Sequence, residues 1–196
     1  MARGWRNAAR WLALALALAV LATAAVISPV RAGASEPVAS QRCVGANVDP
    51  AQASLHFLRS SVLCLVNRVR DHYGLDRLRY NPDLRRSATG HSNDMVTNDY
   101  FSHFGPAGST PSGRITRAGY LSRARSYFLG EDLAGGEGRR YGSPLGVFRA
   151  WIHSPPHRAN ILDPRFHDVG VGVARGFPLS GGSNSATYTI DFGTRS

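Results

Sequence analysis

The stretch that decides the fold reads WIHSPPHRANIL and covers residues 151–162. Apolar residues recur before and within it at spacings of three and four, which predicts one face of a helix: Leu145, Phe148, Trp151 and Ile152. Because proline lacks an amide hydrogen and keeps the preceding residue out of helical geometry, the chain must turn at Ser154 and Pro155. A second short segment follows, anchored by Ile161 and Leu162.

This turn fixes the position of His157 between two buried anchors. Imidazole titrates near neutrality and carries a lone pair when it is uncharged, so His157 is a candidate acid/base or metal-binding group. The alternative is that His157, followed by Arg158 and Asn160, only caps the new helix.

The first 34 residues have the composition of a secretory leader. Three arginines precede an apolar run at 11–27, and Ala32-Gly33-Ala34 offers the small residues that a signal peptidase accepts. The run is 17 residues long, at the lower limit of a spanning helix, so an uncleaved amino-terminal anchor is the alternative. The residues before Cys43 form no lipid-attachment box. We therefore expect a secreted, extracellular protein with no membrane segment after cleavage.

The 162 residues that remain fit one globular domain. All 23 basic residues of the chain are arginine. The leader carries four of them and no acid, so the formal charge falls from +10 to +6 on its removal. This charge favours an anionic partner such as a cell-wall polymer. The arginines form no stripe interleaved with aromatic residues, which argues against a nucleic-acid partner.

Both cysteines, Cys43 and Cys64, lie beyond the leader. An even pair in an exported chain predicts a disulfide. The alternatives are two free thiols, or a Cys64 buried as a small apolar residue. Residues 35–54 are expected to form a linker or approach segment, with Cys43 as its only firm contact, because few large apolar residues occur in its first part.

Residues 55–196 are expected to form the domain. Helical periodicity, capping residues and proline positions predict helices at 51–73, 82–98, 111–118, 144–153 and after 155. The run GVGV at 170–173 alternates as in a buried strand whose glycines admit a close neighbour, and 186–192 completes a hairpin with it. Residues 127–129 are expected to form a brief strand or the end of a loop. Helices that precede strands imply an α+β layered fold in a single domain.

Other polar residues stand near these elements. His91 lies on the apolar face of the second predicted helix, where we expect a hydrogen-bonded core residue. His103 follows the end of that helix, surrounded by aromatic residues, where water or substrate could reach it. Glu131 and Asp132 are adjacent within GEDLAGG at 130–136. Side chains alternate in an extended segment, so only one of these acids can face a given cleft.

Three segments, FSH at 101–103, GEDLA at 130–134 and the stretch 151–162, resemble the CAP superfamily in order and spacing. This superfamily comprises cysteine-rich secretory proteins, insect venom antigens and plant pathogenesis-related proteins. The likeness is greatest to its secreted bacterial branch, often called SCP-like, and covers residues 63–194. It implies a three-layer α-β-α sandwich with a large surface cleft lined by two histidines and two acids.

In this resemblance the two histidines correspond to His103 and His157, and one acid corresponds to Glu131. Ser154 stands where the second acid usually lies, as is common in bacterial relatives, which leaves three of the four cleft groups. Asp132 replaces the usual asparagine. If it pointed inward it would add a negative charge beside Glu131, and if it pointed outward it could accept backbone hydrogen bonds.

These groups leave three functions open. His103, Glu131 and His157 could bind a divalent metal, zinc or calcium, in a hydrolase that cuts cell-wall, peptide or phosphodiester bonds, with Glu131 as ligand or general base. Alternatively the cleft binds a lipid, a glycan or a cell-wall fragment, helped by the aromatic residues Trp151, Tyr100 and Phe101. The third alternative is a hydrogen-bond network that only holds the sheet to its helices. We place binding of a ligand or metal first.

Overall fold

The structure is a computed structural model that describes residues 43–180 and 182–196, all within one compact unit at 33–196. The predicted leader at 1–34, its alternative as an anchor, and residues 35–42 lie outside the described residues. Within the two described ranges, no helix has the length and hydropathy needed to cross a membrane.

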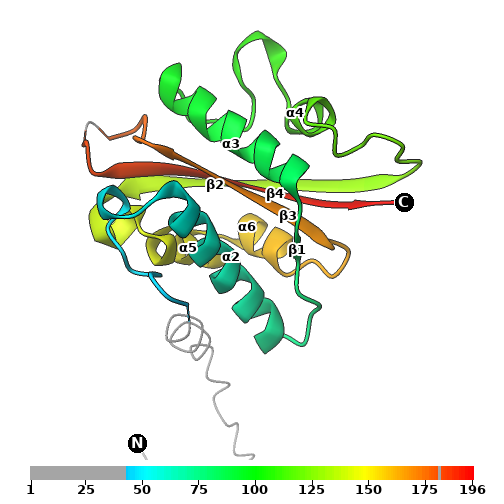
Figure 1. Cartoon of the computed structure of the whole chain (residues 1–196), viewed down its shortest axis with the longest axis horizontal. Helices are drawn as coiled ribbons and strands as arrows, with labels where there is room; N and C mark the ends of the chain where they lie inside the picture. The colour runs from blue at the N-terminus through cyan, green and yellow to red at the C-terminus, as the bar shows by residue number, and fades with distance from the viewer. Residues whose placement is uncertain (1–42, 181) are drawn as a thin grey trace, which may run out of the picture. The chain divides into compact units, whose positions relative to one another are not determined.

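Four strands form one sheet in the order β1-β3-β4-β2, in which β1 runs parallel to β3 and the other pairs are antiparallel. Figure 1 shows α3 on one face of the sheet and α2, α5 and α6 on the other. The predicted α+β fold with three layers is thus confirmed. The elements are η1 (Pro50–Gln52), α2 (Leu55–His72), β1 (Arg79–Tyr80), α3 (Pro82–Thr97), η2 (Pro106–Gly108), α4 (Pro111–Arg117), β2 (Tyr127–Glu137), η3 (Gly138–Gly142), α5 (Pro144–His153), α6 (Pro155–Ile161), β3 (Asp168–Arg175) and β4 (Ser185–Arg195).

The predicted helix starts have the expected caps. The side chain of Asn81 accepts hydrogen bonds from the first turn of α3, Thr110 does so for α4, and Ser143 does so for α5. Between α5 and α6, Ser154 adopts extended geometry with φ −97° and ψ 115°, as the two following prolines require. The turn that places His157 is therefore set by local sequence.

Helix α3 packs directly on the backbone of β3 at two glycines. A Cβ atom added to Gly170 would lie 2.1 Å from the backbone nitrogen of Arg85, and one added to Gly172 would lie 2.2 Å from the carbonyl carbon of Ala88. The predicted close approach at these glycines is confirmed. It brings the inner face of α3, which carries Ser87 and His91, down onto the sheet.

Three secondary-structure predictions were wrong in detail. The strand expected at 127–129 is the eleven-residue β2, because its glycine-rich part pairs with β4 along its whole length, from Tyr127 opposite Arg195 to Glu137 opposite Ser185. The first helix begins at Leu55 and not at 51, because the hydroxyl of Ser54 caps it. The two-residue strand β1 was not predicted.

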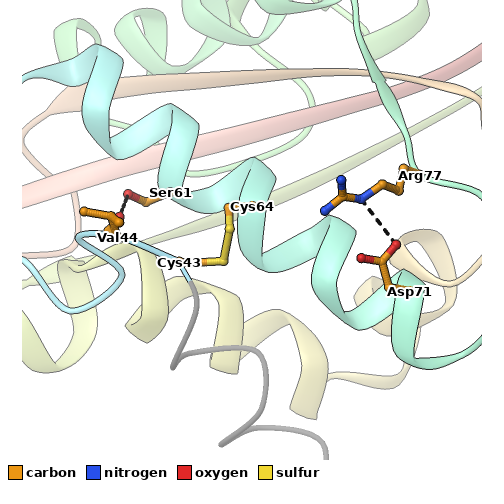
Figure 2. Close-up of a disulfide and its surroundings, with 6 residues drawn as sticks. All are labelled: Cys43, Val44, Ser61, Cys64, Asp71 and Arg77. Atoms are coloured by element: carbon orange, nitrogen blue, oxygen red, sulfur yellow. Dashed lines mark hydrogen bonds and ion pairs between the residues drawn. A yellow bond between two sulfur atoms is a disulfide. The ribbon is translucent and has the colours of Figure 1, made fainter.

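The predicted disulfide between Cys43 and Cys64 is present, with the two Cα atoms 5.8 Å apart (Figure 2). Cys43 is not the only firm contact of its segment, so that expectation was wrong. The hydroxyl of Ser61 donates to the carbonyl of Val44 at 2.8 Å, and the amide of Leu145 donates to the carbonyl of Ala46 at 2.7 Å. Small side chains let this segment lie close enough to α2 and α5 for its backbone to bond.

Replacing both cysteines by serine is expected to lower the free energy of unfolding by about 3 kcal/mol, because the bond restricts the unfolded chain over a separation of 21 residues. The variant should still unfold cooperatively, since the backbone bonds to Val44 and Ala46 persist. Urea denaturation of the variant and of the oxidised and reduced wild type measures this. Equal midpoints for all three would show that the disulfide does not stabilise the fold.

Candidate functional site

Glu131 is a buried carboxylate on β2, with a side chain only 2% exposed. Its two oxygens bind different partners: Oε1 lies 2.8 Å from Nδ1 of His103, and Oε2 accepts a hydrogen bond from Nη2 of Arg114 at 2.7 Å. Burial alone would raise the pKa of Glu131, but the hydrogen bonds from His103 and Arg114 and the charge of Arg114 outweigh it and leave the pKa below its usual value. Glu131 is therefore ionised at neutral pH.

Arg114, in α4, joins this carboxylate to the loop that carries His103. The same Nη2 atom that donates to Glu131 also donates to the backbone carbonyl of His103 at 2.9 Å, and Nη1 donates to the hydroxyl of Ser109 at 3.3 Å. Arg114 thus neutralises a buried charge and fixes the loop. The sequence predicts a helix at Arg114 but no role for it, and the only local signal is its place next to the buried Ile115.

His103 is the open member of this group, with 42% of its side chain exposed. Its Nδ1 faces the carboxylate of Glu131, which can only accept a hydrogen bond. In the tautomer whose Nδ1–H donates to Glu131, the lone pair of the ring lies on Nε2. Among the described residues, Nε2 has no hydrogen-bond partner. The carboxylate therefore orients an imidazole whose second nitrogen is free for a ligand.

His157 lies in the first turn of α6 and is partly buried. Burial lowers its pKa, and repulsion from His103 lowers it further, so the ring is neutral at neutral pH. Its Nδ1 is buried without a hydrogen-bond partner in the described part of the chain. Ser154 occupies the helix cap, so His157 does not cap α6. The structure thus joins His103 to Glu131, while the link between His157 and His103 is limited to the effect of the His103 charge on the pKa of His157.

Asp132 points to the opposite face of the sheet, as alternation along β2 requires. It is fully buried, and Nδ2 of Asn160 in α6 donates to its Oδ1 at 2.7 Å. Burial raises the pKa of Asp132 to about 8, with a further increase from the charge of Glu131 and an opposing effect of the hydrogen bond from Asn160. Asp132 therefore adds no full negative charge beside Glu131 at neutral pH.

His91 is a hydrogen-bonded core residue, as predicted. Its Nε2 lies 3.0 Å from the carbonyl of Ser102 and 3.9 Å from Oε1 of Glu131, and the side chain is fully buried. Burial lowers the pKa of His91 despite the nearby carboxylate, so the ring is neutral. His91 is therefore a buried, neutral neighbour of the Glu131 carboxylate.

Asp191 is an acid next to this group that sequence analysis did not identify. It lies directly opposite Glu131 in the pairing of β4 with β2 and is fully buried. Neither of its carboxyl oxygens has a hydrogen-bond partner among the described residues. Burial, and after it the charge of Glu131, raises the pKa of Asp191 well above its usual value, which favours its uncharged form beside the ionised Glu131.

The aromatic residues expected to help a ligand are arranged differently. Trp151 is fully buried and donates from Nε1 to the carbonyl of Leu133 at 2.9 Å, so it cannot contact a ligand and that prediction was wrong. Phe101 packs edge-on against Phe177, with ring centroids 5.3 Å apart, and the hydroxyl of Tyr100 donates to Asp94. Phe104, which follows His103, is 66% exposed and is the aromatic side chain open to solvent there.

The groups brought together here are one buried carboxylate and two imidazoles, those of His103 and His157. Each oxygen of Glu131 has one hydrogen-bond partner, and the bond through Oε1 orients His103. Within residues 43–180 and 182–196, no group of three histidine, cysteine or acidic side chains is arranged to hold a metal ion. The two imidazoles are the groups that can contact a bound molecule.

Comparison with known proteins gives consistent matches. The model of the cysteine-rich secretory protein family, CAP, matches residues 63–190. The protein YkwD of Bacillus subtilis is 33% identical over 122 residues, which are 62% of this chain and 44% of YkwD. The chain therefore matches less than half the length of that relative.

Two solved structures are also similar. An extracellular protein containing an SCP domain from Bacillus anthracis has a TM-score of 0.56 and 25% identity, over 71% of this chain and 43% of that one. An outer surface protein from Borrelia burgdorferi has a TM-score of 0.56 and 20% identity, over 69% of this chain and 90% of that one. The second likeness concerns the fold alone.

Replacing Arg114 by methionine is expected to lower the free energy of unfolding by about 3–5 kcal/mol, because it leaves the buried charge of Glu131 without its cation. The double variant Arg114→Met, Glu131→Gln should recover most of that loss. Urea denaturation measures both. Arg77→Met, which removes an exposed partner of Asp71, is the matched control and should cost less than about 1 kcal/mol. A double variant no more stable than the single one would contradict this account.

Asp132→Asn is expected to become more stabilising as the pH rises. The folded pKa of Asp132, about 8, lies above the unfolded value of 3.8. The acid therefore contributes stability fully below pH 3.8, and that contribution is lost as the pH rises through 8, whereas asparagine stays neutral. The free energy of unfolding of the variant relative to wild type should increase by about 4 kcal/mol between about pH 5 and pH 9, because each pH unit up to the folded pKa changes it by about 1.36 kcal/mol. Denaturation at several pH values tests this, and a constant difference would refute it.

Proposed function

The chain belongs to the cysteine-rich secretory protein (CAP) family, and on that premise we propose that it is an extracellular protein whose cleft binds a cell-wall fragment through His103 and His157. The extracellular location is supported by the leader expected at 1–34 and by the likeness to the extracellular Bacillus anthracis protein. In this proposal the buried carboxylate of Glu131 holds the imidazole of His103 in the orientation that binds the ligand.

The observation that carries this proposal is the pairing of His103 with Glu131. A half-exposed imidazole that touches a nearly fully buried carboxylate at 2.8 Å is held in one orientation. A histidine whose only role was to hold the sheet to its helices through hydrogen bonds would be expected to be buried, whereas the side chain of His103 is 42% exposed. The free Nε2 of His103 and the neutral ring of His157 can each exchange a hydrogen bond with a hydroxyl, amide or carboxylate group.

The surroundings favour a glycan strand with peptide substituents. Phe104, the residue after His103 in the chain, has an exposed aromatic ring, and such a ring can pack against the apolar face of a sugar. The expected mature charge of +6 favours the anionic polymers of a cell wall. Sugar hydroxyls and peptide carboxylates supply the partners that the two imidazoles require.

Calorimetric titration with soluble peptidoglycan fragments tests the proposal. His103→Gln and Phe104→Ser are each expected to weaken binding by about tenfold or more, because central contacts dominate the binding energy. Tyr141→Ser removes another exposed aromatic side chain and should leave affinity unchanged. Absence of binding by wild type, or equal affinities for all four proteins, would overturn the proposal.

A metal-dependent hydrolase is the second candidate, favoured by the same carboxylate-oriented imidazole. A zinc or calcium ion held by His103 and His157 would supply Lewis acidity, while Glu131 would keep His103 oriented. Titration with each ion, compared with the double variant His103→Ala, His157→Ala, separates this candidate from simple binding. Equal heats for both proteins, together with no product from peptidoglycan, casein or plasmid DNA, would exclude it.

A further inference from the structure

A pocket lies at the β1 edge of the sheet, whereas Glu131 lies on the opposite edge strand β2. Its volume is about 580 Å³. It is enclosed by α2, by β1 with the start of α3, and by β3. The residues that matter for its chemistry are His56, Arg59, Leu63, Tyr80, Arg85 and Val171.

The inner wall of this pocket is apolar. Val171 on β3 is buried, and Leu63 on α2 is partly buried and packs against the main hydrophobic core. The partly exposed ring of Tyr80 stands at the mouth. The wall can therefore take up an apolar group of modest size.

Two arginines lie together in this pocket without an acid. The Nε of Arg85 donates to the hydroxyl of Tyr80 at 2.8 Å, which holds that guanidinium in place. Burial lowers the pKa of Arg59, and the neighbouring charge of Arg85 lowers it further, so the two cations repel each other. In the described part of the chain neither arginine forms an ion pair, and Arg59 has no hydrogen-bond partner.

Three other arginines, by contrast, have several hydrogen-bond acceptors or an acid as partner. The guanidinium of Arg70 donates to four backbone carbonyls, that of Arg114 donates to Glu131, and that of Arg175 donates to the carbonyls of Pro50 and Ala53. Two partly buried cations that repel each other are stabilised when an anion binds between them. Because the wall beside the two arginines is apolar, a ligand that fills the pocket needs an apolar part next to its anionic group.

We propose that this pocket binds an organic anion, in which a carboxylate or phosphate group contacts Arg59 and Arg85 and an aliphatic group packs on Leu63 and Val171. The planar guanidinium groups match both headgroups, so the shared chemistry is one anionic group on an apolar chain. The site is separate from the cleft of His103 and Glu131, and it does not depend on the function proposed for that cleft.

Calorimetric titration of the purified full chain with four probes tests this assignment: decanoate, decyl phosphate, decanol and inorganic phosphate, each below its micelle-forming concentration. Wild type should bind one or both of the decyl anions, and the tighter of the two identifies the headgroup. Arg59→Gln and Arg85→Gln should each raise the Kd by about tenfold. Arg77→Gln, which removes an equal charge elsewhere, should leave the Kd unchanged. The ring proton signals of His56 should shift on binding, which places the ligand in this pocket.

Several outcomes would overturn the assignment. Decanol binding as tightly as the decyl anions would show an apolar pocket without anion recognition, and inorganic phosphate binding as tightly would show that the apolar wall contributes nothing. Failure of both decyl anions to bind, or an unchanged Kd in the two pocket variants, would also exclude it. Binding of peptidoglycan fragments by Arg59→Gln is measured in parallel and should equal that of wild type, so failure of one proposal is distinguishable from failure of the other.

Discussion

The buried charge of Glu131 is the constraint on which the rest of the site depends. A carboxylate almost fully removed from water must be paired, and its partners Arg114 and His103 both lie in the long segment between α3 and β2. The interaction that keeps the charge ionised therefore also holds this segment against the sheet. Burial lowers the pKa of His91 and His157 and raises that of Asp191, so each of these groups favours its uncharged form. The negative charge of Glu131 is thus left to Arg114 and the open imidazole of His103.

The packing of the sheet decides which groups meet. Two glycines on β3 let α3 approach the strand backbone, and this places His91 and Ser87 over the same face as Glu131 and Asp191. Because side chains alternate along β2, Asp132 lies on the other face of the sheet, where it accepts a hydrogen bond from Asn160. The adjacent acids Glu131 and Asp132 thus differ in protonation state at neutral pH because they occupy different environments, and only Glu131 is a full negative charge on its face of the sheet.

Local signals in the sequence were sufficient for much of this fold. Asparagine, threonine and serine before proline predicted the starts of α3, α4 and α5, and the glycine-valine alternation predicted the close contact of β3. Family resemblance, and no local pattern, suggested that His103 and Glu131 meet. The full length of β2 and the roles of Arg114 and Asp191 depend on cross-strand register and on compensation of a buried charge. Both arise from residues distant in sequence, so periodicity could not reveal them.

The most direct test of this account is the titration of the Glu131 carboxyl group by carbon NMR. The chain contains three glutamates, so selective labelling of their side-chain carboxyl carbons yields three signals, and the one missing from Glu131→Gln identifies the residue. The account predicts that this signal keeps the shift of an ionised carboxylate well below pH 4.5, the ordinary midpoint, until the fold is lost. A reversible midpoint at or above that value in the folded protein would show that His103 and Arg114 do not hold the charge, and the site described here would be contradicted.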